Sequence, residues 1–500
     1  MTPQPGSTPV IPGFWSDPTV CRVGDDYYLA NSSFEYFPAG PVHHSTDLVG
    51  WRQVGNVADR RSQLDLRGAA PSSGVFGATL RHHDGRFWFI TTDMATIDQG
   101  LLIFTAEHAA GPWSEPVRVP GLHGIDPDLA WDQDGTCYLS WCRFEPGVTR
   151  GIWQVRVRPA TGQVLTDPVL LWTGTGMRDP EGPHLYPIGD RWYLLIAEGG
   201  TGRGHAVSVA RSDRPDGPFE PGPANPVLTH RSTDHPVQGV GHGDLVQTPE
   251  GAWAIVYHGV RPAGAFPEFH VLGRETFLAT VTWDDAGWPT VVEPDLSARV
   301  PAPATRRFVD RFREPALAAR WVTPAADLSR ARVRPEGGVS LTAHGGDSTS
   351  SAGALVVRVS DLGWQVRVET ETTAEDEVRL LLRLDDTHWY GIETRAGRVR
   401  VLGRAGPFTQ VFADRETGPG PSASTLWLRA VPGPPGLDPT GGPDEIVLGT
   451  AGPTGDVELA RIDGRYLSTE VAGGFTGRTV GVQALAGAPV LRAFEYTPTL

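Results

Sequence analysis

An internal repeat is the sequence feature that most constrains the fold of this chain. A turn dipeptide followed by aromatic and aliphatic residues recurs with a period of about 50 to 60 residues, which is typical of propeller-like arrays. The five copies are Gly24–Leu29, Asp84–Phe89, Asp134–Leu139, Gly189–Leu194 and Glu250–Ile255. Gly and Asp tolerate positive φ angles and can close tight hairpins, and the residues that follow suit a half-buried strand. The repeat therefore indicates five copies of one hairpin unit.

A short apolar strand precedes each turn and begins with a distinctive residue. The five segments are Asp17–Val20, Phe76–Leu80, Asp126–Leu129, Glu181–Leu185 and His242–Leu245. Further strand segments follow the hairpins, so the pattern predicts an all-β fold, a five-bladed β-propeller over residues 1–295. Because the first strand of each blade lies nearest the axis, we expect Asp17, Asp126, Glu181 and His242 to share one pocket.

The repeat ends near residue 290, and a second pattern follows. Pro294, Pro301 and Pro303 indicate a linker over residues 296–306. Alternating apolar and polar residues between turn clusters then predict a β-sandwich over residues 307–500.

Composition excludes several classes of function. A net charge of −15 argues against binding nucleic acid or an anionic membrane, because both need basic patches. No apolar run approaches the roughly 20 residues that span a bilayer. The three cysteines give neither a disulfide framework nor a spaced set of metal ligands. No signal-peptide pattern is visible at the N-terminus, so the sequence-based expectation is a cytoplasmic protein.

Three carboxylates in one pocket would suit cleavage of a glycosidic bond, which needs one acid and one base. A negative charge on Asp126 would raise the pKa of Glu181, making Glu181 the acid and Asp17 the base. Each residue also has a structural interpretation. Asp17 and Asp126 precede proline, as turn residues often do, and a lone His242 is more often a hydrogen-bonded core residue. Their shared place in the repeat favours the functional interpretation.

Over nearly its whole length, the sandwich included, the sequence resembles glycoside hydrolase family 43, in particular its β-xylosidase and α-L-arabinofuranosidase members with a C-terminal concanavalin-like β-sandwich. The segments that carry this resemblance are residues 16–18, 24–28, 33–38, 43–48, 181–186 and 272–277. The resemblance implies an inverting mechanism with Asp17 as general base, Asp126 as the residue that tunes and orients the acid, and Glu181 as general acid.

The same resemblance implies further substrate-binding residues. His242 and Arg274 would line the pocket, Phe34 would form an aromatic wall, and Phe475 is the candidate tip of a closing loop from the sandwich. Phe76, in Phe76-Gly77-Ala78, stands where relatives commonly carry a tryptophan followed by Ala-Pro. This departure reshapes one wall and leaves the choice between xylose and arabinose open.

The function that the resemblance implies is exo-acting hydrolysis that releases terminal xylose, with arabinofuranose as a side activity, from pentose-containing oligosaccharides. The alternatives are a dedicated α-L-arabinofuranosidase, a carbohydrate-binding propeller without catalysis and a protein-interaction propeller. No cofactor is required by this chemistry. Some family members hold a structural calcium ion near the axis, where His242 could either serve or bond a water or a carboxylate. The sequence leaves homo-oligomerisation open.

Overall fold

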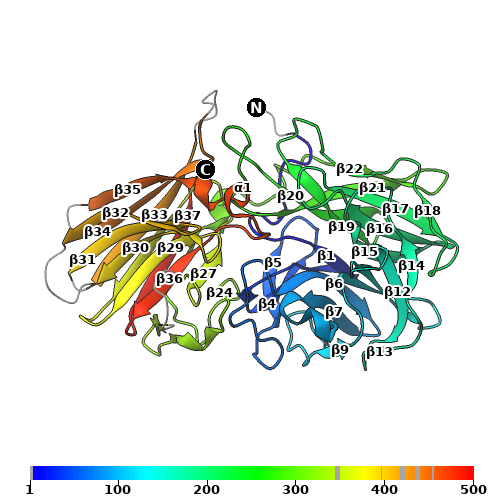
Figure 1. Ribbon diagram of the computed structural model, residues 1–500, viewed down its shortest axis with the longest axis horizontal. Helices are drawn as coiled ribbons and strands as arrows, with labels where there is room; N and C mark the ends of the chain where they lie inside the picture. The colour runs from blue at the N-terminus through cyan, green and yellow to red at the C-terminus, as the bar shows by residue number, and fades with distance from the viewer. Residues whose placement is uncertain are drawn as a thin grey trace.

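The structure, a computed structural model, describes residues 4–343, 350–395, 397–416, 423–433, 440–452 and 455–499 (Figure 1). Within these ranges the protein is all-β, as the repeat predicted. The helical segments there are one α-helix and four 3₁₀ helices: α1 (Thr469–Ala472), η1 (Met94–Gln99), η2 (Pro303–Arg306), η3 (Leu328–Arg330) and η4 (Gly464–Leu467). None of them is long and apolar enough to cross a membrane.

Residues 19–292 form five separate antiparallel sheets that follow one another along the chain. The first contains β1 (Thr19–Val23), β2 (Asp26–Ala30), β4 (Ala39–Ser45) and β5 (Arg52–Ala58). The second contains β6 (Val75–His83), β7 (Arg86–Asp93), β8 (Leu101–Ala106) and β9 (Val117–Val119). The third contains β10 (Ile125–Trp131), β11 (Cys137–Arg143), β12 (Gly151–Arg158), β13 (Gln163–Val164) and β14 (Val169–Trp172).

The fourth and fifth sheets complete this series. The fourth contains β15 (Glu181–Ile188), β16 (Arg191–Glu198), β17 (Ala206–Ser212) and β18 (Glu220–Pro221). The fifth contains β19 (Gln238–Gln247), β20 (Trp253–Val260), β21 (Glu275–Trp283) and β22 (Pro289–Val292). In every sheet the repeated turn dipeptide lies in the hairpin between the first two strands, and one glycine of that hairpin has a positive φ angle.

The five sheets pack against one another in cyclic order. Each first strand contacts the next one, from β1 through β6, β10 and β15 to β19, and β19 contacts β1. Apolar clusters lie between neighbouring sheets, and one of them joins the first sheet to the fifth through Leu29 and Val256. Burial of such side chains is the main force that holds separate sheets together. This packing brings the starts of the first strands to one place.

A buried polar network links all five first strands near that place. Asp244 on β19 accepts hydrogen bonds from Thr19 Oγ1 at 2.7 Å and from Arg81 Nη1 at 2.8 Å. Arg81 Nη2 also donates to Asp128 Oδ1 at 2.9 Å, and the Leu185 amide donates to Asp128 Oδ2. Buried charges are tolerated when they are paired and hydrogen-bonded. Asp128 is therefore a structural residue.

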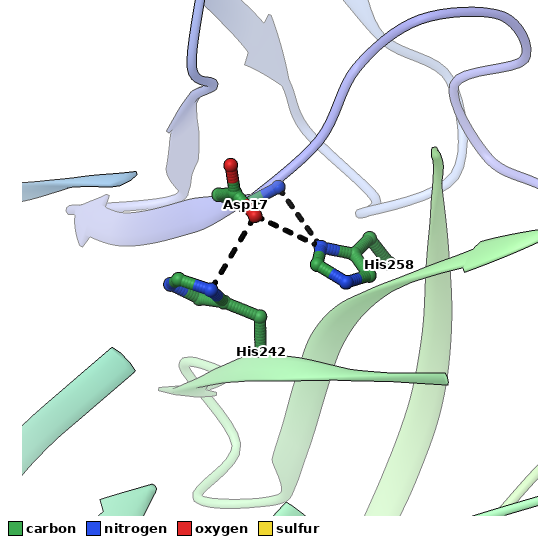
Figure 2. A group of neighbouring side chains, drawn as sticks. All are labelled: Asp17, His242 and His258. Atoms are coloured by element: carbon green, nitrogen blue, oxygen red, sulfur yellow. Dashed lines mark hydrogen bonds and ion pairs between the residues drawn. The ribbon is translucent and has the colours of Figure 1, made fainter. Parts of the chain in front are cut away.

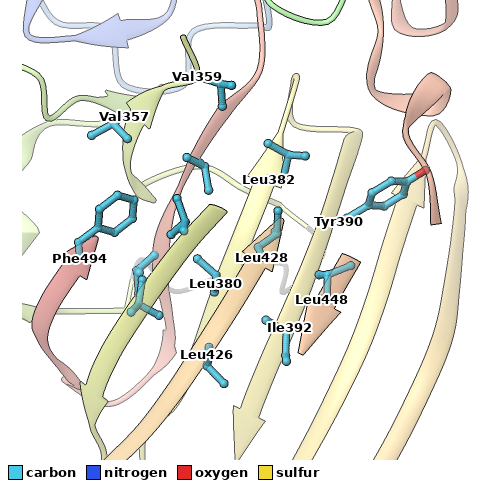
Figure 3. Close-up of a cluster of buried hydrophobic side chains, with 14 of the residues drawn as sticks. Val357, Val359, Leu380, Leu382, Tyr390, Ile392, Leu426, Leu428, Leu448 and Phe494 are labelled. Atoms are coloured by element: carbon cyan, nitrogen blue, oxygen red, sulfur yellow. The ribbon is translucent and has the colours of Figure 1, made fainter. Parts of the chain in front are cut away.

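The C-terminal half forms two larger sheets that pack face to face. One contains β23 (Phe308–Asp310), β25 (Ala331–Val333), β26 (Val339–Leu341), β28 (Trp364–Glu371), β33 (Ala423–Pro432), β34 (Asp444–Gly452), β35 (Gly455–Asp463) and β37 (Val490–Pro498). The other contains β27 (Leu355–Arg358), β29 (Glu377–Arg383), β30 (His388–Arg395), β31 (Arg398–Ala405), β32 (Phe408–Glu416) and β36 (Thr479–Ala486). Inward-facing residues of both sheets, such as Leu380, Leu428 and Phe494, form one apolar core (Figure 3). The predicted β-sandwich is present.

Direct contacts, in addition to the connecting chain, join the two halves. β3 (Tyr36–Phe37) pairs with β24 (Thr323–Pro324) in a two-stranded sheet. Arg383 of the sandwich donates to Tyr36 Oη at 2.5 Å. An apolar cluster that includes Phe34, Val322 and Leu381 crosses the same boundary. These contacts hold the sandwich beside the end of the first sheet.

Candidate active site

One pocket of about 380 Å³ lies where the first strands converge, and every site residue expected from the sequence lines it. Phe76, Asp126 and Glu181 lie at the starts of β6, β10 and β15, and Asp17 lies two residues before β1. The complete lining is Asp17, Phe34, Phe76, Gly77, Ile125, Asp126, Arg150, Arg178, Asp179, Glu181, Gly200, Thr201, His242, Arg274 and Phe475.

Irregular backbone aims these side chains into the pocket. The strand register shifts at the pocket end of β6, β10, β15 and β19, and such bulges re-aim side chains next to active sites. Asp17, Asp126 and His242 adopt φ angles of 52°, 53° and 49°, a left-handed conformation that is rare for residues other than glycine. In β15 the equivalent left-handed residue is Gly182, with φ 56°. Glu181 thus lies one residue before the position that the other three share.

Asp17 is buried and ionised. Its carboxylate accepts hydrogen bonds from Arg274 Nη1 at 2.8 Å and from Ser32 Oγ at 2.5 Å. His258 Nδ1 and His242 Nδ1 lie 3.1 Å and 3.4 Å from Asp17 Oδ1 (Figure 2). Burial alone would raise the pKa of Asp17, but the Arg274 guanidinium and then His242 hold it well below its usual range. Asp17 is therefore equipped to accept a proton.

Glu181 has the opposite environment. Burial raises the pKa of Glu181 to about 8, and the negative charges of Asp126 and Asp17 add to the effect. Burial also raises the pKa of Asp126, but His242 and the Gly182 amide, which donates to Asp126 Oδ2 at 3.1 Å, favour its ionised form. The proton that this carboxyl pair retains near neutral pH is thus on Glu181. Two carboxyl groups with separated pKa values are the usual arrangement of an acid and a base.

Three aromatic rings from distant segments form one wall. Phe34 and Phe475 stack with ring centroids 5.8 Å apart, and Phe76 meets both rings edge-on at 5.3 Å and 5.8 Å. Phe475 belongs to the sandwich, and its amide donates to Ser72 Oγ at 2.9 Å. The Arg274 guanidinium lies 5.7 Å and 5.5 Å from the Phe34 and Phe475 rings. The sandwich therefore supplies part of the pocket wall.

A calcium ion does not fit the donor atoms at the base of the pocket. Asp17, His242 and His258 present ligand atoms within 4.8 Å of one another, but Ca²⁺ takes six to eight oxygen ligands. Two of these donors are imidazoles, and His258 Nδ1 already accepts the Asp17 amide at 3.1 Å. The carboxylate of Asp17 is bonded to the cationic Arg274. The set is suited to hold Asp17 ionised rather than to bind a metal ion.

Sequence reasoning missed several residues of this site. Ser32 and His258 contact Asp17, but neither begins a repeat unit. The missed His258 lies on a second strand, β20, opposite Gly241 of β19. Arg178 and Asp179 also line the pocket, and they lie immediately before Pro180-Glu181 in the chain. Proximity to Glu181 in the chain was the one signal that could have identified them.

The chain matches two known family profiles. The profile for glycosyl hydrolases family 43 matches residues 7–289, and the profile for a beta xylosidase C-terminal concanavalin A-like domain matches residues 309–490. These two matches coincide with the five-sheet half and the sandwich half.

Individual relatives agree with the profiles. A non-reducing end alpha-L-arabinofuranosidase of Bacteroides ovatus is 35% identical over 504 residues, covering 95% of this chain and 90% of the relative. A xylosidase/arabinosidase of Butyrivibrio fibrisolvens is 44% identical over 57% of this chain and 56% of its own length. The crystal structure of a xylan beta-1,4-xylosidase from Bacillus halodurans is 28% identical, with TM-score 0.84 over 98% of this chain and 99% of that one. The chain therefore belongs to glycosyl hydrolase family 43 and is a glycosidase.

Proposed function

We propose that this enzyme is an exo-acting, inverting glycosidase that releases terminal xylose from xylo-oligosaccharides. The observation that carries the proposal is the opposite tuning of two carboxyl groups in one pocket. Asp17 is held ionised by Arg274, whereas burial keeps Glu181 protonated up to about pH 8. Glycosidases need this combination.

A proposal about the fold rests on the cyclic packing of the five sheets. We propose that the five cyclically packed sheets are the blades of a five-bladed β-propeller over residues 1–295. Residues 296–306 would be a linker and residues 307–500 the sandwich domain. The family profiles, which end at residue 289 and resume at residue 309, support these limits.

In the proposed mechanism Glu181 donates its proton to the glycosidic oxygen as the bond from that oxygen to the anomeric carbon breaks. Asp17 removes a proton from a water molecule that attacks the opposite face of the sugar, which inverts the anomeric centre. Asp126 holds the proton on Glu181 by its charge. Arg274 keeps Asp17 ionised and faces the pocket, where it can also donate to sugar hydroxyl groups. The chemistry requires no metal.

Exo action is supported by the closed base of the pocket. Asp17, His242 and His258 are all at least 96% buried there, while Phe475 covers one side. A chain passing through would need two open ends, whereas this pocket accepts one terminal sugar. The substrate would enter with its non-reducing end first.

A dedicated α-L-arabinofuranosidase is the second candidate, favoured by the Bacteroides ovatus relative of that name. Turnover of nitrophenyl β-xyloside and nitrophenyl α-arabinofuranoside separates the two candidates. We expect the xyloside to have the higher kcat/KM. A higher value for the arabinofuranoside would reverse the assignment without changing the reaction class.

The pH profile tests the tuning of the acid. Wild-type kcat/KM should fall as the pH rises through about 8, because Glu181 then loses the proton that it must donate. Asp126→Asn removes a negative charge beside Glu181, so the pKa of Glu181 falls and the alkaline limb moves to lower pH. Asp213→Asn, at a carboxylate that is 81% exposed, serves as control. An alkaline limb that stays in place in Asp126→Asn would contradict this role.

The aromatic wall is tested by Phe475→Ala. Removing the ring opens the pocket on the sandwich side, and we expect kcat/KM to fall by about tenfold. Phe408→Ala is the matched control, because Phe408 lies on β32 of the same domain and is 77% exposed. Steady-state kinetics on xylobiose measures both variants. Equal activity of Phe475→Ala and the control would show that the sandwich does not contribute to the binding site.

A further inference from the structure

The mouth of the pocket carries two arginines that the proposed mechanism does not use. Arg150 Nη1 and Arg178 Nε bind the two carboxylate oxygens of Asp179 at 2.7 Å and 2.5 Å. All three residues line the pocket. One carboxylate faces two guanidinium groups, so this group carries a net charge of +1 in a chain whose overall charge is −15.

The remaining donors of these arginines point outward. The side chain of Arg178 is 77% exposed and that of Arg150 is 47% exposed. Within the described ranges, the Arg178 guanidinium donates a hydrogen bond only through Nε, and the Arg150 guanidinium contacts a carboxylate only through Nη1, as an ion pair. Arg150 also lies 5.9 Å from the Phe144 ring, which restricts its position. Asp179 thus orients both guanidinium groups and leaves several N–H donors available to a ligand.

These donors lie on the side where the departing sugar must be. Asp179 precedes the proposed acid Glu181 by two residues and contributes to its raised pKa. The acid delivers its proton to the oxygen that links the terminal sugar to the next one. Since the base of the pocket is closed around Asp17, the next sugar projects toward the mouth, past Arg178 and Arg150.

We propose that the mouth is a subsite for an oligosaccharide that carries a carboxylate, namely a uronate, on the sugar next to the one released. This inference rests on the proposed function and names its substrate class more closely. The planar fork of an arginine matches a carboxylate with two parallel hydrogen bonds. A neutral sugar offers these donors hydroxyl oxygens but no negative charge.

A matched pair of substrates tests the subsite. The acidic member is a xylo-oligosaccharide with a terminal xylose followed by a xylose that bears a uronate, and the neutral member is the same compound with its carboxyl group reduced to an alcohol. For the wild-type enzyme we expect kcat/KM to be about fivefold higher for the acidic member at low salt. The preference should decrease at high salt, because ions screen exposed charges. Equal values at low salt would overturn the proposal.

Reversing the charge of Arg178 gives a more sensitive test of the subsite than the substrate pair alone. Arg178→Glu should bring the acidic-to-neutral ratio below one, because two carboxylates then face the uronate. Arg191→Glu is the control, since Arg191 is also partly exposed and paired with an aspartate, Asp213, but does not line the pocket; its ratio should match that of the wild type. An unchanged ratio in Arg178→Glu would exclude the subsite. Failure of wild type to release xylose from either member would instead overturn the proposed function.

Discussion

Glu181→Gln is expected to lower kcat on xylobiose by about 10²- to 10⁴-fold, the usual contribution of a general acid. Glutamine has nearly the same shape as glutamate but cannot deliver a proton to the leaving oxygen. The loss should be far smaller for a dinitrophenyl xyloside, because dinitrophenolate leaves without protonation. The alkaline limb of the pH profile near 8, which we assign to Glu181, should disappear for that substrate.

The control for this variant is Glu250→Gln, at an exposed glutamate of the fifth repeated turn. It should retain full activity on both substrates. Equal losses on xylobiose and on the dinitrophenyl xyloside would show that Glu181 does not act as the proton donor. A Glu181→Gln enzyme with wild-type turnover would exclude it from the reaction.

Asp17→Ala is expected to reduce kcat on both substrates by about 10²- to 10⁴-fold, because no group then removes the proton from the attacking water. The readout that separates this role from a structural one is rescue by azide. Azide is already an anion and needs no base, so it should restore turnover and yield a xylosyl azide of inverted configuration. Removal of the carboxylate also leaves space for the azide beside Arg274.

Asp25→Ala provides the matched control, since Asp25 is an exposed aspartate in the turn that follows β1. Its activity should be unchanged, and azide should have no effect on it. Thermal unfolding of both variants checks that the fold is intact, because Asp17→Ala leaves the Arg274 guanidinium without its partner. A folded Asp17→Ala enzyme that azide does not rescue would contradict the assignment of Asp17 as base.

The repeat predicted the pocket because equivalent strands of successive repeat units lie side by side, so their first residues come together. The strand segments that precede the repeated turns begin at Asp17, Asp126 and His242, and these three residues share one backbone conformation. Glu181 was placed in the same register but lies one residue earlier. The turns differ in length, since β1 and β2 pair from Val23 to Asp26, whereas β10 and β11 pair from Trp131 to Cys137. The number of residues between the repeated turn and the pocket residue therefore differs by one between repeat units.

Other parts of the site had no periodic signal. Ser32 and His258 contact Asp17 from positions outside the repeat register, and only the folded chain brings them together. Phe475 came from the family resemblance, because strand alternation cannot show which sandwich loop reaches the pocket. Exposed loop arginines such as Arg178 are usually solvated, and their place at the mouth becomes clear only from the pocket lining.

Proton NMR of the first sugar released from a β-xyloside tests the central claim most directly. If Asp17 activates a water molecule opposite the proton donor Glu181, the initial product is α-xylose, which then equilibrates slowly with its β form. Initial appearance of β-xylose would mean that the configuration is retained, and the assignment of Asp17 as a base acting on water would be wrong.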